Sequence, residues 1–455
     1  MRVVYVSLSY LPTVAGGVQV LTHSIAKEMQ ARGHEVEVIC AESIESGDDD
    51  RIRTERTIYD DIPVVRLSFN RYHMPRYFRT FYDIPQVGEH LFKLYEAQKP
   101  DLFHITHFSR LTASIFQGIR RLGVPSILTL ADYTFFCPLG TLLRYNGDIC
   151  AGARAVGGVK CLGCFVDETR TYKNSVFRRF LNADQVAAGL KVLGKTPLVR
   201  SVLPSIYSDA AEIFEDRVKF FDSVLPCIDL FTTNNHWSRQ FYIDQGFPPE
   251  RTRCVVQTLD VSWSHDFVRT PYSGPFRIGF TGAVVSHKGV DVLVKAYQRM
   301  KHRDRAEVFI YGDNVSHPLY LQELEALCGG NKRIHMKGSY WPTDLKRIYN
   351  EMDVLVVPSM FYETGPLVIL EAQATRTPVL ASNLGPIREL VRHGIDGYLF
   401  ERGDDRELAA LLDRICEDPD ELGRLRANIR PVKTIGAMAD ELEALYHEST
   451  RARAA

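Results

Sequence analysis

The sequence lacks several features, and each absence argues against a class of protein. No run of residues approaches the roughly 18 apolar residues that a membrane-spanning helix needs. The formal net charge is -1, so overall charge gives no reason to expect nucleic acid or an acidic polymer as a partner. The first residues enter a strand-like segment without the charged and apolar regions of a secretory signal. We therefore expect a cytoplasmic protein.

Two common cofactor-binding motifs are also missing. Neither half carries a G-x-G-x-x-G turn with an acidic residue about twenty positions later, which argues against a Rossmann oxidoreductase. The triplet Asp48-Asp49-Asp50 lies in a polar stretch rather than after a strand, so a catalytic magnesium ion is not expected. The nine cysteines predict thiols or metal ligands rather than extensive disulfides.

What the sequence does contain is an alternation of strand-like and helix-like segments. The first series runs from Val3–Ser9 through a glycine-containing loop to the helical spacing of Val20–Ala31 and the strand-like Glu35–Cys40. A similar series begins at Phe276–Thr281 and Val290–Met300. This alternation predicts an α/β protein with two Rossmann-like domains, each a parallel sheet covered by helices. Further strands are expected at 101–104, 126–130, 230–233, 307–311, 334–337, 354–357, 379–381 and 398–400.

A polar, proline-bearing stretch at Trp263–Pro275 is typical of a linker between the two domains. We therefore expect an N-terminal domain at 1–265, a C-terminal domain at 266–432 and a final helix at 433–455. Ligands bind outside the carboxyl ends of the strands in such folds. The functional residues are thus expected in loops after strands, facing a cleft between the two sheets.

The strongest functional signal is the segment Pro358–Ala372, which leaves an apolar strand and enters a helix. Glu363 and Glu371 are separated by a little more than two helical turns, so both can face one pocket. A carboxylate can accept two hydrogen bonds from neighbouring sugar hydroxyls. Backbone N–H groups at a helix start suit a phosphate, although Pro366 has none to donate.

Several motifs occur in a characteristic order: Gly16-Gly17, Gly33-His34-Glu35-Val36, Lys288-Gly289, Asp353, Glu363 with Glu371, and Thr377-Pro378-Val379. Their order and spacing resemble the large retaining GT-B glycosyltransferase family often called GT4, or glycosyltransferase group 1. The signature of that family is a pair of glutamates with seven residues between them. The similarity covers most of both halves and is weakest at 40–100 and 140–225.

This resemblance implies a fold and an activity. In a GT-B fold the domain at 1–265 would bind the acceptor, and the domain at 266–432 would bind a nucleotide sugar. A hexosyltransferase of this kind moves a sugar from a UDP-, GDP- or ADP-sugar to a hydroxyl of a glycan, a lipid-linked saccharide or a metabolite, as in polysaccharide biosynthesis. The resemblance also implies retention of anomeric configuration and no catalytic metal.

The same resemblance implies roles for individual residues of the donor site. Glu363 would contact the transferred sugar, and Glu371 would hold the ribose hydroxyls. Lys288 would stabilise the charge of the departing diphosphate. The remaining donor contacts would come from Gly16, Gly17, Gly282, Gly365, Pro366 and Leu367.

Two residues that follow neighbouring strands are implied on the acceptor side. His107 matches a family histidine that reaches the transferred sugar better than the nearby His104 does. Asp132 is a candidate acceptor-site residue, but Ala131 stands before it where the family usually has a histidine.

Other departures concern the donor half. Ala283 replaces an arginine that often serves the diphosphate, Arg376 replaces a glycine, and Thr258-Leu259 replaces Asn-Gly. These departures leave a second hypothesis open: a degenerate GT-B scaffold that contains metal and binds ligand without transferring sugar.

Four cysteines, Cys137, Cys150, Cys161 and Cys164, fall close together, and the last two form Cys-x-x-Cys. Four thiolates can hold one zinc ion or an iron–sulfur cluster and so fold a segment with little hydrophobic core. We expect an insertion at 137–164 with a structural metal, preferably zinc. Four unrelated thiols are the alternative.

The segment Arg170–Arg200 contains seven Lys or Arg residues and one acidic residue. A basic run of this kind can hold an enzyme at the anionic inner face of a membrane. An ordinary solvated helical face is equally compatible with the same composition.

Overall fold

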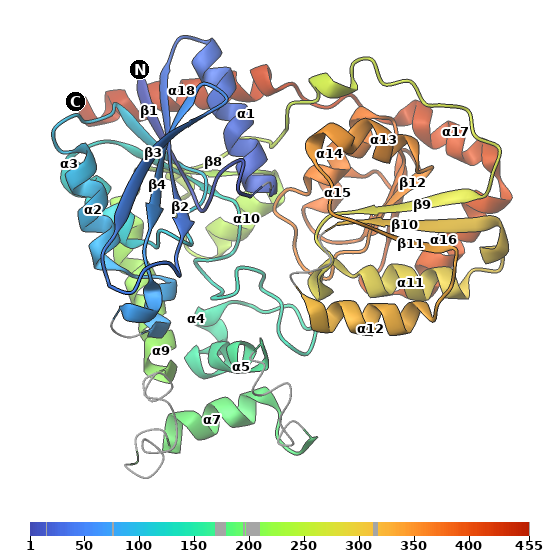
Figure 1. The fold of residues 1–455 in the computed structure, drawn as a ribbon, viewed down its shortest axis with the longest axis horizontal. Helices are drawn as coiled ribbons and strands as arrows, with labels where there is room; N and C mark the ends of the chain where they lie inside the picture. The colour runs from blue at the N-terminus through green and yellow to red at the C-terminus, as the bar shows by residue number, and fades with distance from the viewer. Residues whose placement is uncertain are drawn as a thin grey trace. The chain divides into compact units, whose positions relative to one another are not determined.

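The computed structural model describes residues 1–14, 16–74, 77–168, 179–193, 196, 210–312 and 317–454. They form two compact units. Unit 1 comprises Met1–Asn234, Tyr242–Val255 and Ala439–Ala455, and unit 2 comprises Asn235–Phe241 and Val256–Met438. Each unit is a largely parallel sheet with helices against it (Figure 1), so the predicted α/β class with two Rossmann-like domains is confirmed.

The sheet of unit 1 has the strand order β3-β4-β2-β1-β5-β6-β7-β8. Only the edge strand β3 pairs antiparallel to its neighbour. The central strands are almost entirely buried, as is typical of parallel strands covered on both faces. The bounds are β1 Arg2–Ser7, β2 Glu35–Ser43, β3 Arg53–Tyr59, β4 Ile62–Ser68, β5 Leu102–Ile105, β6 Ser126–Leu130, β7 Leu230–Thr233 and β8 Thr252–Cys254.

Helices of unit 1 cover this sheet and form an additional helical layer in which α5 packs against α7 and α9. The last helix, α18 (Ile435–Ala454), closes the sheet, because the Tyr446 hydroxyl hydrogen-bonds to the hydroxyl of Tyr5 at 3.1 Å and to Nδ1 of His104 at 2.6 Å. The other helices are α1 Gly17–Ala31, α2 Pro85–Tyr95, α3 Ser114–Leu122, α4 Ala153–Val156, α5 Gly158–Glu168, α7 Ala183–Leu193 and α9 Ala210–Val224. Helix α10 (His236–Asp244) begins in unit 2 and ends in unit 1.

The sheet of unit 2 is parallel throughout, with the order β11-β10-β9-β12-β13-β14. Its strands are β9 Phe276–Thr281, β10 Ala306–Tyr311, β11 Ile334–Gly338, β12 Val354–Val357, β13 Val379–Ser382 and β14 Gly397–Phe400. One apolar core joins it to α11 (Val290–Arg299), α12 (Pro318–Cys328), α16 (Asp405–Glu417) and α17 (Pro419–Asn428). A second core joins it to α13 (Leu345–Asn350), α14 (Leu367–Ala374) and α15 (Ile387–Leu390).

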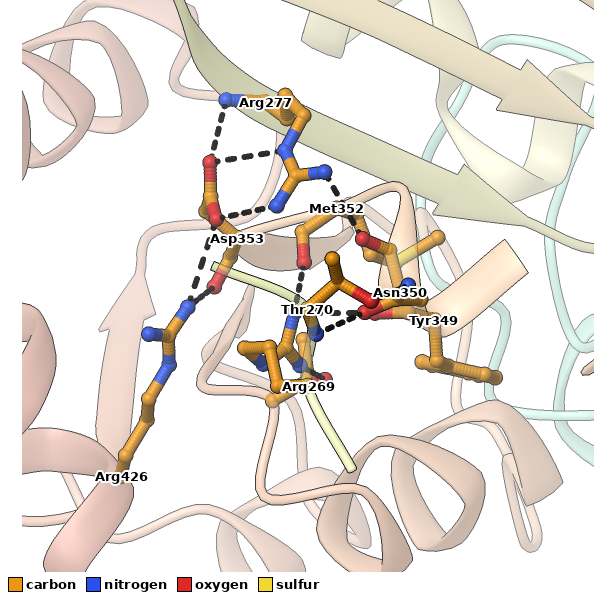
Figure 2. Close-up of polar contacts among 9 residues, drawn as sticks. Arg269, Thr270, Arg277, Tyr349, Asn350, Met352, Asp353 and Arg426 are labelled. Carbon is orange, nitrogen blue, oxygen red and sulfur yellow. Dashed lines mark hydrogen bonds and ion pairs between the residues drawn. The ribbon is translucent and has the colours of Figure 1, made fainter. Parts of the chain in front are cut away.

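The amino-terminal edge of this second sheet is held by Asp353 (Figure 2). Its carboxylate accepts hydrogen bonds from the backbone N–H, Nε and Nη2 of Arg277 at 3.0, 3.2 and 2.9 Å, and it pairs with Arg426 at 3.5 Å. Arg269 lies beside them and donates to the carbonyls of Tyr349 and Met352 at 3.1 and 2.6 Å. The match at Asp353 therefore has a structural role: it fastens β9 and β12 to α17.

The same network explains where the linker segment packs. Arg269 ties this segment to unit 2, and Trp263 and Phe267 pack against the second core. The sequence-based boundary between residues 265 and 266 thus falls inside unit 2, which begins again at Val256. Residues from Ala439 onward, within the predicted final helix, pack with unit 1.

Candidate active site

Lys288 and Glu363 are in direct contact in unit 2, in loops that follow two neighbouring strands. Lys288 ends a short turn after β9, and Glu363 lies between β12 and α14. The Lys288 Nζ atom lies 2.6 Å from Oε1 of Glu363, and the Ser359 hydroxyl donates to the same oxygen at 2.6 Å. The glutamate side chain is 8% exposed and the lysine side chain 27%. A buried carboxyl group therefore lies in direct contact with a partly exposed amino group.

The two loops are locked together by their backbones. Gly289 has φ +69°, and a Cβ atom there would lie 2.0 Å from the carbonyl oxygen of Pro358. Only glycine therefore fits after Lys288. The Met360 N–H also donates to the carbonyl of His287 at 2.8 Å.

Two aromatic rings lie beside the ammonium group of Lys288: Phe361 is near Nζ, and His287 packs on Phe361. The ring centroid of Phe361 lies 5.2 Å from Nζ, a cation–π distance. The His287 ring meets the edge of Phe361 at 5.0 Å. Burial and then the neighbouring Lys288 lower the pKa of His287 to about 4, so this imidazole is neutral near pH 7.

Glu371 lies on α14 and has different partners. One carboxylate oxygen accepts a hydrogen bond from the Tyr349 hydroxyl at 2.9 Å. Burial raises the pKa of Glu371 to about 7, although the bond from Tyr349 acts in the opposite direction. Glu371 is thus a second carboxyl group in unit 2. The hydrogen bond from Tyr349 occupies only one of its acceptor positions, so the group can accept further hydrogen bonds. That Glu363 and Glu371 meet around one ligand stays a prediction.

The backbone around Gly365, Pro366 and Leu367 leads into α14, which begins at Leu367. The carbonyl of Gly365 accepts a hydrogen bond from Nε2 of Gln257 at 3.3 Å. Gly282 directly follows β9 with φ +131°, and its N–H donates to the carbonyl of Tyr311 at 3.0 Å. Their contact with a donor stays a prediction.

In unit 1, His107 and Asp132 are hydrogen-bonded to each other, with Nε2 3.0 Å from Oδ2. The backbone N–H of Ser109 donates to Nδ1 of His107 at 3.2 Å, so Nδ1 is an acceptor and Nε2 carries the proton. Both ring nitrogens of His107 therefore have hydrogen-bond partners, and the bond from Nε2 orients the Asp132 carboxylate. The expected contact of His107 with the transferred sugar stays a prediction.

Asp132 is further fixed by Thr134, which donates from its backbone N–H at 2.9 Å and from its hydroxyl at 2.6 Å. Burial alone would raise the pKa of Asp132, but the effects of His107 and Thr134 outweigh it and lower the pKa. Asp132 is therefore suited to accept hydrogen bonds rather than to remove a proton. His104 is structural, since burial lowers its pKa to about 3 and both its nitrogens are bonded.

The glycine pair of unit 1 starts helix α1. Gly16 is the extended residue before the helix, with φ -94° and ψ 171°, and Gly17 is its first residue. The Gly16 carbonyl accepts the first helical hydrogen bond, from the Val20 N–H at 3.0 Å. The backbone N–H groups at this helix start suit a phosphate, and their contact with a donor stays a prediction.

Two known protein families match this chain. The model of the family "Glycosyl transferases group 1" matches residues 261–432, and that of the "Glycosyl transferase 4-like domain" matches residues 16–157. Each match covers one of the two halves in the expected order. The chain belongs to the GT-B, GT4-like glycosyltransferase family. Its Lys288–Glu363 pair falls within the first match, and its His107–Asp132 pair within the second.

Curated relatives of this chain are named as glycosyltransferases. A D-inositol 3-phosphate glycosyltransferase of Thermobispora bispora is 33% identical over 182 residues, which are 37% of this chain and 42% of that protein. An uncharacterized glycosyltransferase of Methanocaldococcus jannaschii is 31% identical over 252 residues, or 51% of this chain and 63% of the relative. The matched region thus spans roughly half the length of these curated relatives.

Solved structures support the fold. Anabaena HepE, in complex with UDP and glucose, has a TM-score of 0.63 at 16% identity, covering 98% of this chain and 99% of HepE. Sucrose-phosphate synthase from Thermosynechococcus elongatus has a TM-score of 0.65 at 18% identity and 99% coverage of both chains. At these identities the similarity shows only the fold, and this chain has the GT-B fold.

The predicted structural metal is not supported. Cys137, Cys150, Cys161 and Cys164 lie close enough for their charges to interact. In the described part of the chain, however, no group of three or more His, Cys, Asp or Glu side chains could hold a metal ion. Cys161 and Cys164 lie on one helix, α5, and the Cys150 sulfur accepts a hydrogen bond from the Gly152 N–H at 3.3 Å.

The segment around these cysteines has another source of stability. Phe135 packs against Phe221 and Phe247 at centroid distances of 4.8 and 5.3 Å, and the Arg217 guanidinium lies over Phe221 at 4.5 Å. Arg217 also donates to the carbonyl of Thr134. Burial raises the pKa of Cys161 to about 12, which favours a protonated thiol. The local cysteine spacing did not reveal these aromatic partners, because they come from distant parts of the sequence.

Five of the seven basic residues in Arg170–Arg200 lie outside the described residues, so the membrane contact of this run stays a prediction. No helix among the described residues is long and apolar enough to cross a membrane. The Asp48–Asp50 triplet is in a bend, where Asp49 bonds to Arg53 at 3.0 Å.

Four residues of the candidate site were not predicted: Ser359, Tyr349, Asn235 and Gln257. Ser359 lies in the glutamate motif and could have been noticed as a hydroxyl four residues before Glu363. The other three come from segments remote in sequence, so only the folded chain reveals their contacts.

Proposed function

We propose that this chain transfers a hexose from a nucleotide-sugar donor, bound in unit 2, to a hydroxyl of an acceptor recognised by unit 1. The acceptor class includes glycans, lipid-linked saccharides and glycosylated metabolites. The Lys288–Glu363 contact carries the proposal, because it places a cation for a diphosphate beside a carboxylate for a sugar hydroxyl. Family membership supports the same reading.

The proposed reaction retains the anomeric configuration. The bond from the anomeric carbon to the diphosphate oxygen breaks, and a bond from the same carbon to the acceptor oxygen forms on the same face. The acceptor proton moves to the departing diphosphate oxygen, giving a nucleoside diphosphate and a glycoside. Lys288 stabilises the charge on the leaving group, so the proposed step uses no metal ion.

Asp132 serves the acceptor in this proposal. His107 and Thr134 hold its carboxylate in one orientation, and a low pKa keeps it ionised and able to accept acceptor hydroxyls. The alternative of a non-catalytic scaffold is not favoured, because the Lys288–Glu363 pair is intact despite Ala131 and Ala283.

A thermal-unfolding screen with UDP-, GDP- and ADP-glucose tests the donor proposal. A ligand that binds only the folded state at 100 times its Kd adds about 2.7 kcal/mol of stability, which corresponds to a rise of about 5 °C in Tm. We expect one nucleotide class to give such a rise and the corresponding nucleoside diphosphate to be released during turnover. If no nucleotide sugar raises Tm, the proposal loses its basis.

Donor affinity should increase with pH between 6 and 8. Below its pKa of about 7, Glu371 is protonated and accepts fewer hydrogen bonds from a ribose diol. If only the carboxylate binds, Kd for the nucleotide sugar falls about tenfold from pH 6 to pH 8. Calorimetric titration of a UDP-sugar checks this, since its diphosphate diester does not titrate in that range.

Glu371→Gln is the control for this pH dependence. A glutamine side chain does not titrate, so the variant should bind the donor with an affinity that hardly changes with pH. The sign for the free protein is opposite: a raised pKa favours the folded state at low pH, and this contribution is lost as pH rises through 7. An equal pH dependence in wild type and variant would rule out Glu371 as its origin.

A further inference from the structure

Helix α10 begins with a segment that belongs to a different unit from the strand before it. Strand β7 and residue Asn234 belong to unit 1, whereas the seven residues Asn235–Phe241 belong to unit 2. From Tyr242 the chain is again part of unit 1. The start of α10 is therefore embedded in the unit that carries Glu363.

Asn235 uses both ends of its side-chain amide. Its Oδ1 accepts the backbone N–H of Ser238 at 2.7 Å, which caps the start of α10. Its Nδ2 donates to the carbonyl oxygen of Thr364 at 2.6 Å. The residue is 6% exposed, so this bond is protected from water. Because the cap fixes the amide orientation, the donor end is directed at the residue after Glu363.

Trp237, two residues after Asn235, packs against Tyr362, the residue before Glu363. Its ring centroid lies 4.5 Å from that of Tyr362. The indole also packs against Gly385, where a Cβ atom would lie 2.2 Å from Cε2. The carboxylate of Glu389 accepts the backbone N–H of Trp237 at 2.5 Å and that of His236 at 3.1 Å. The first turn of α10 is thus fastened on three sides.

We infer that Asn235 and Trp237 are positioning residues that set the geometry of the donor loop at Glu363–Gly365. The Thr364–Gly365 peptide is trans, so its carbonyl and its N–H point in opposite directions. The bond from Asn235 fixes the carbonyl of Thr364 and therefore turns the Gly365 N–H away from α10. Trp237 holds the Tyr362 ring, so both neighbours of Glu363 are fixed while its carboxylate meets Lys288.

Gln257 adds a second restraint on the same loop. Its Nε2 donates to the carbonyl of Gly365, and a Cβ atom on Gly365 would lie 2.0 Å from its Oε1. Since residue 366 is a proline, this peptide offers no N–H of its own. The Gly365 N–H is then the loop donor whose direction depends on Asn235. This inference rests on the proposed function, because it takes the loop to receive a nucleotide-sugar diphosphate.

Asn235→Ser tests the inference with the full chain. Serine retains a capping oxygen, so α10 should form and Tm should stay close to that of wild type. The shorter side chain removes the Nδ2 donor to the carbonyl of Thr364 and so loosens the orientation of the Thr364–Gly365 peptide. We expect Kd and KM for the nucleotide sugar identified in the screen to rise at least about tenfold. KM for the acceptor should not change.

Trp237→Phe and Gln240→Ala complete the design. Phenylalanine keeps a ring against Tyr362, so Trp237→Phe should retain more donor affinity than Trp237→Ala. Gln240 is exposed on the same helix, and Gln240→Ala should bind the donor as wild type does. A folded Asn235→Ser variant with unchanged donor Kd and KM would overturn the inference. Wild type that binds no nucleotide sugar would instead overturn the proposed function.

Discussion

Replacing Lys288 by alanine is expected to lower the rate of sugar transfer by about 10² to 10³-fold. The ammonium group lies 2.6 Å from Glu363, and it would oppose the negative charge that develops on the departing diphosphate. Removing one preorganised charge of this kind costs about 3–4 kcal/mol of transition-state stabilisation. Ala283 stands where the family often supplies an arginine, so the loss should not be buffered by a second cation there. Release of nucleoside diphosphate with and without acceptor measures the effect.

Two further variants separate this role from a role in folding. Lys295→Ala removes a lysine whose pair with Asp291 lies on the exposed surface of α11, and it should leave transfer unchanged. Combining Lys288→Ala with Glu363→Gln should lower activity by much less than the product of the single effects, because the two groups act as a unit. Full activity in a folded Lys288→Ala variant would contradict the proposed donor site.

Strands that are buried on both faces were predictable from the sequence. The bounds of β6, β7, β9 and β12 coincide with the expected strands, because strands that are covered on both faces are rich in apolar residues. The hairpin of β3 and β4 was missed. β3 is an exposed edge strand, Arg53–Tyr59, rich in charged residues. The turn of this hairpin, Asp60-Asp61, has φ values of 49° and 62° but contains no glycine. Neither the hydrophobic pattern nor the turn residues therefore indicate a hairpin.

The sequence predicted site residues that belong to a local motif. It did not predict the contacts that folding makes between residues far apart in the sequence. Glu363 and Lys288 were identified separately, but their contact joins residues 75 positions apart. The same holds for His107 and Asp132, whose side chains are hydrogen-bonded to each other across 25 positions of the sequence. The cysteine cluster failed in the opposite way: local spacing predicted a metal, whereas aromatic residues from α9 and beyond supply the core.

Asp353 illustrates how a motif residue can serve stability rather than chemistry, and Asp353→Ala should destabilise unit 2 by about 3 kcal/mol. Its carboxylate is 15% exposed and pairs with Arg277 and Arg426. Removing one member of a largely buried ion pair leaves the remaining charges uncompensated, at a cost of about 3–5 kcal/mol. The expected fall in Tm is about 6–12 °C for a unit of this size.

Repulsion among the arginines around Asp353 increases this effect (Figure 2). Burial first, and then Arg426, lower the pKa of Arg269 to about 10, and Asp353 is the group that opposes this shift. Without that carboxylate, three guanidinium groups would share one partly buried site. Asp353→Asn should be less damaging than Asp353→Ala, because the amide oxygen still accepts a hydrogen bond from Arg277.

Urea denaturation monitored by circular dichroism measures the change in unfolding free energy. Asp266→Ala provides the matched control, since its pair with Lys346 at 2.6 Å is exposed and belongs to the same unit; it should produce no resolvable shift. Equal stabilities for wild type and Asp353→Ala would mean that β9, β12 and α17 are held by apolar packing alone. The expected result instead assigns a large share of the joining of these elements to one carboxylate, in addition to the apolar core that they share.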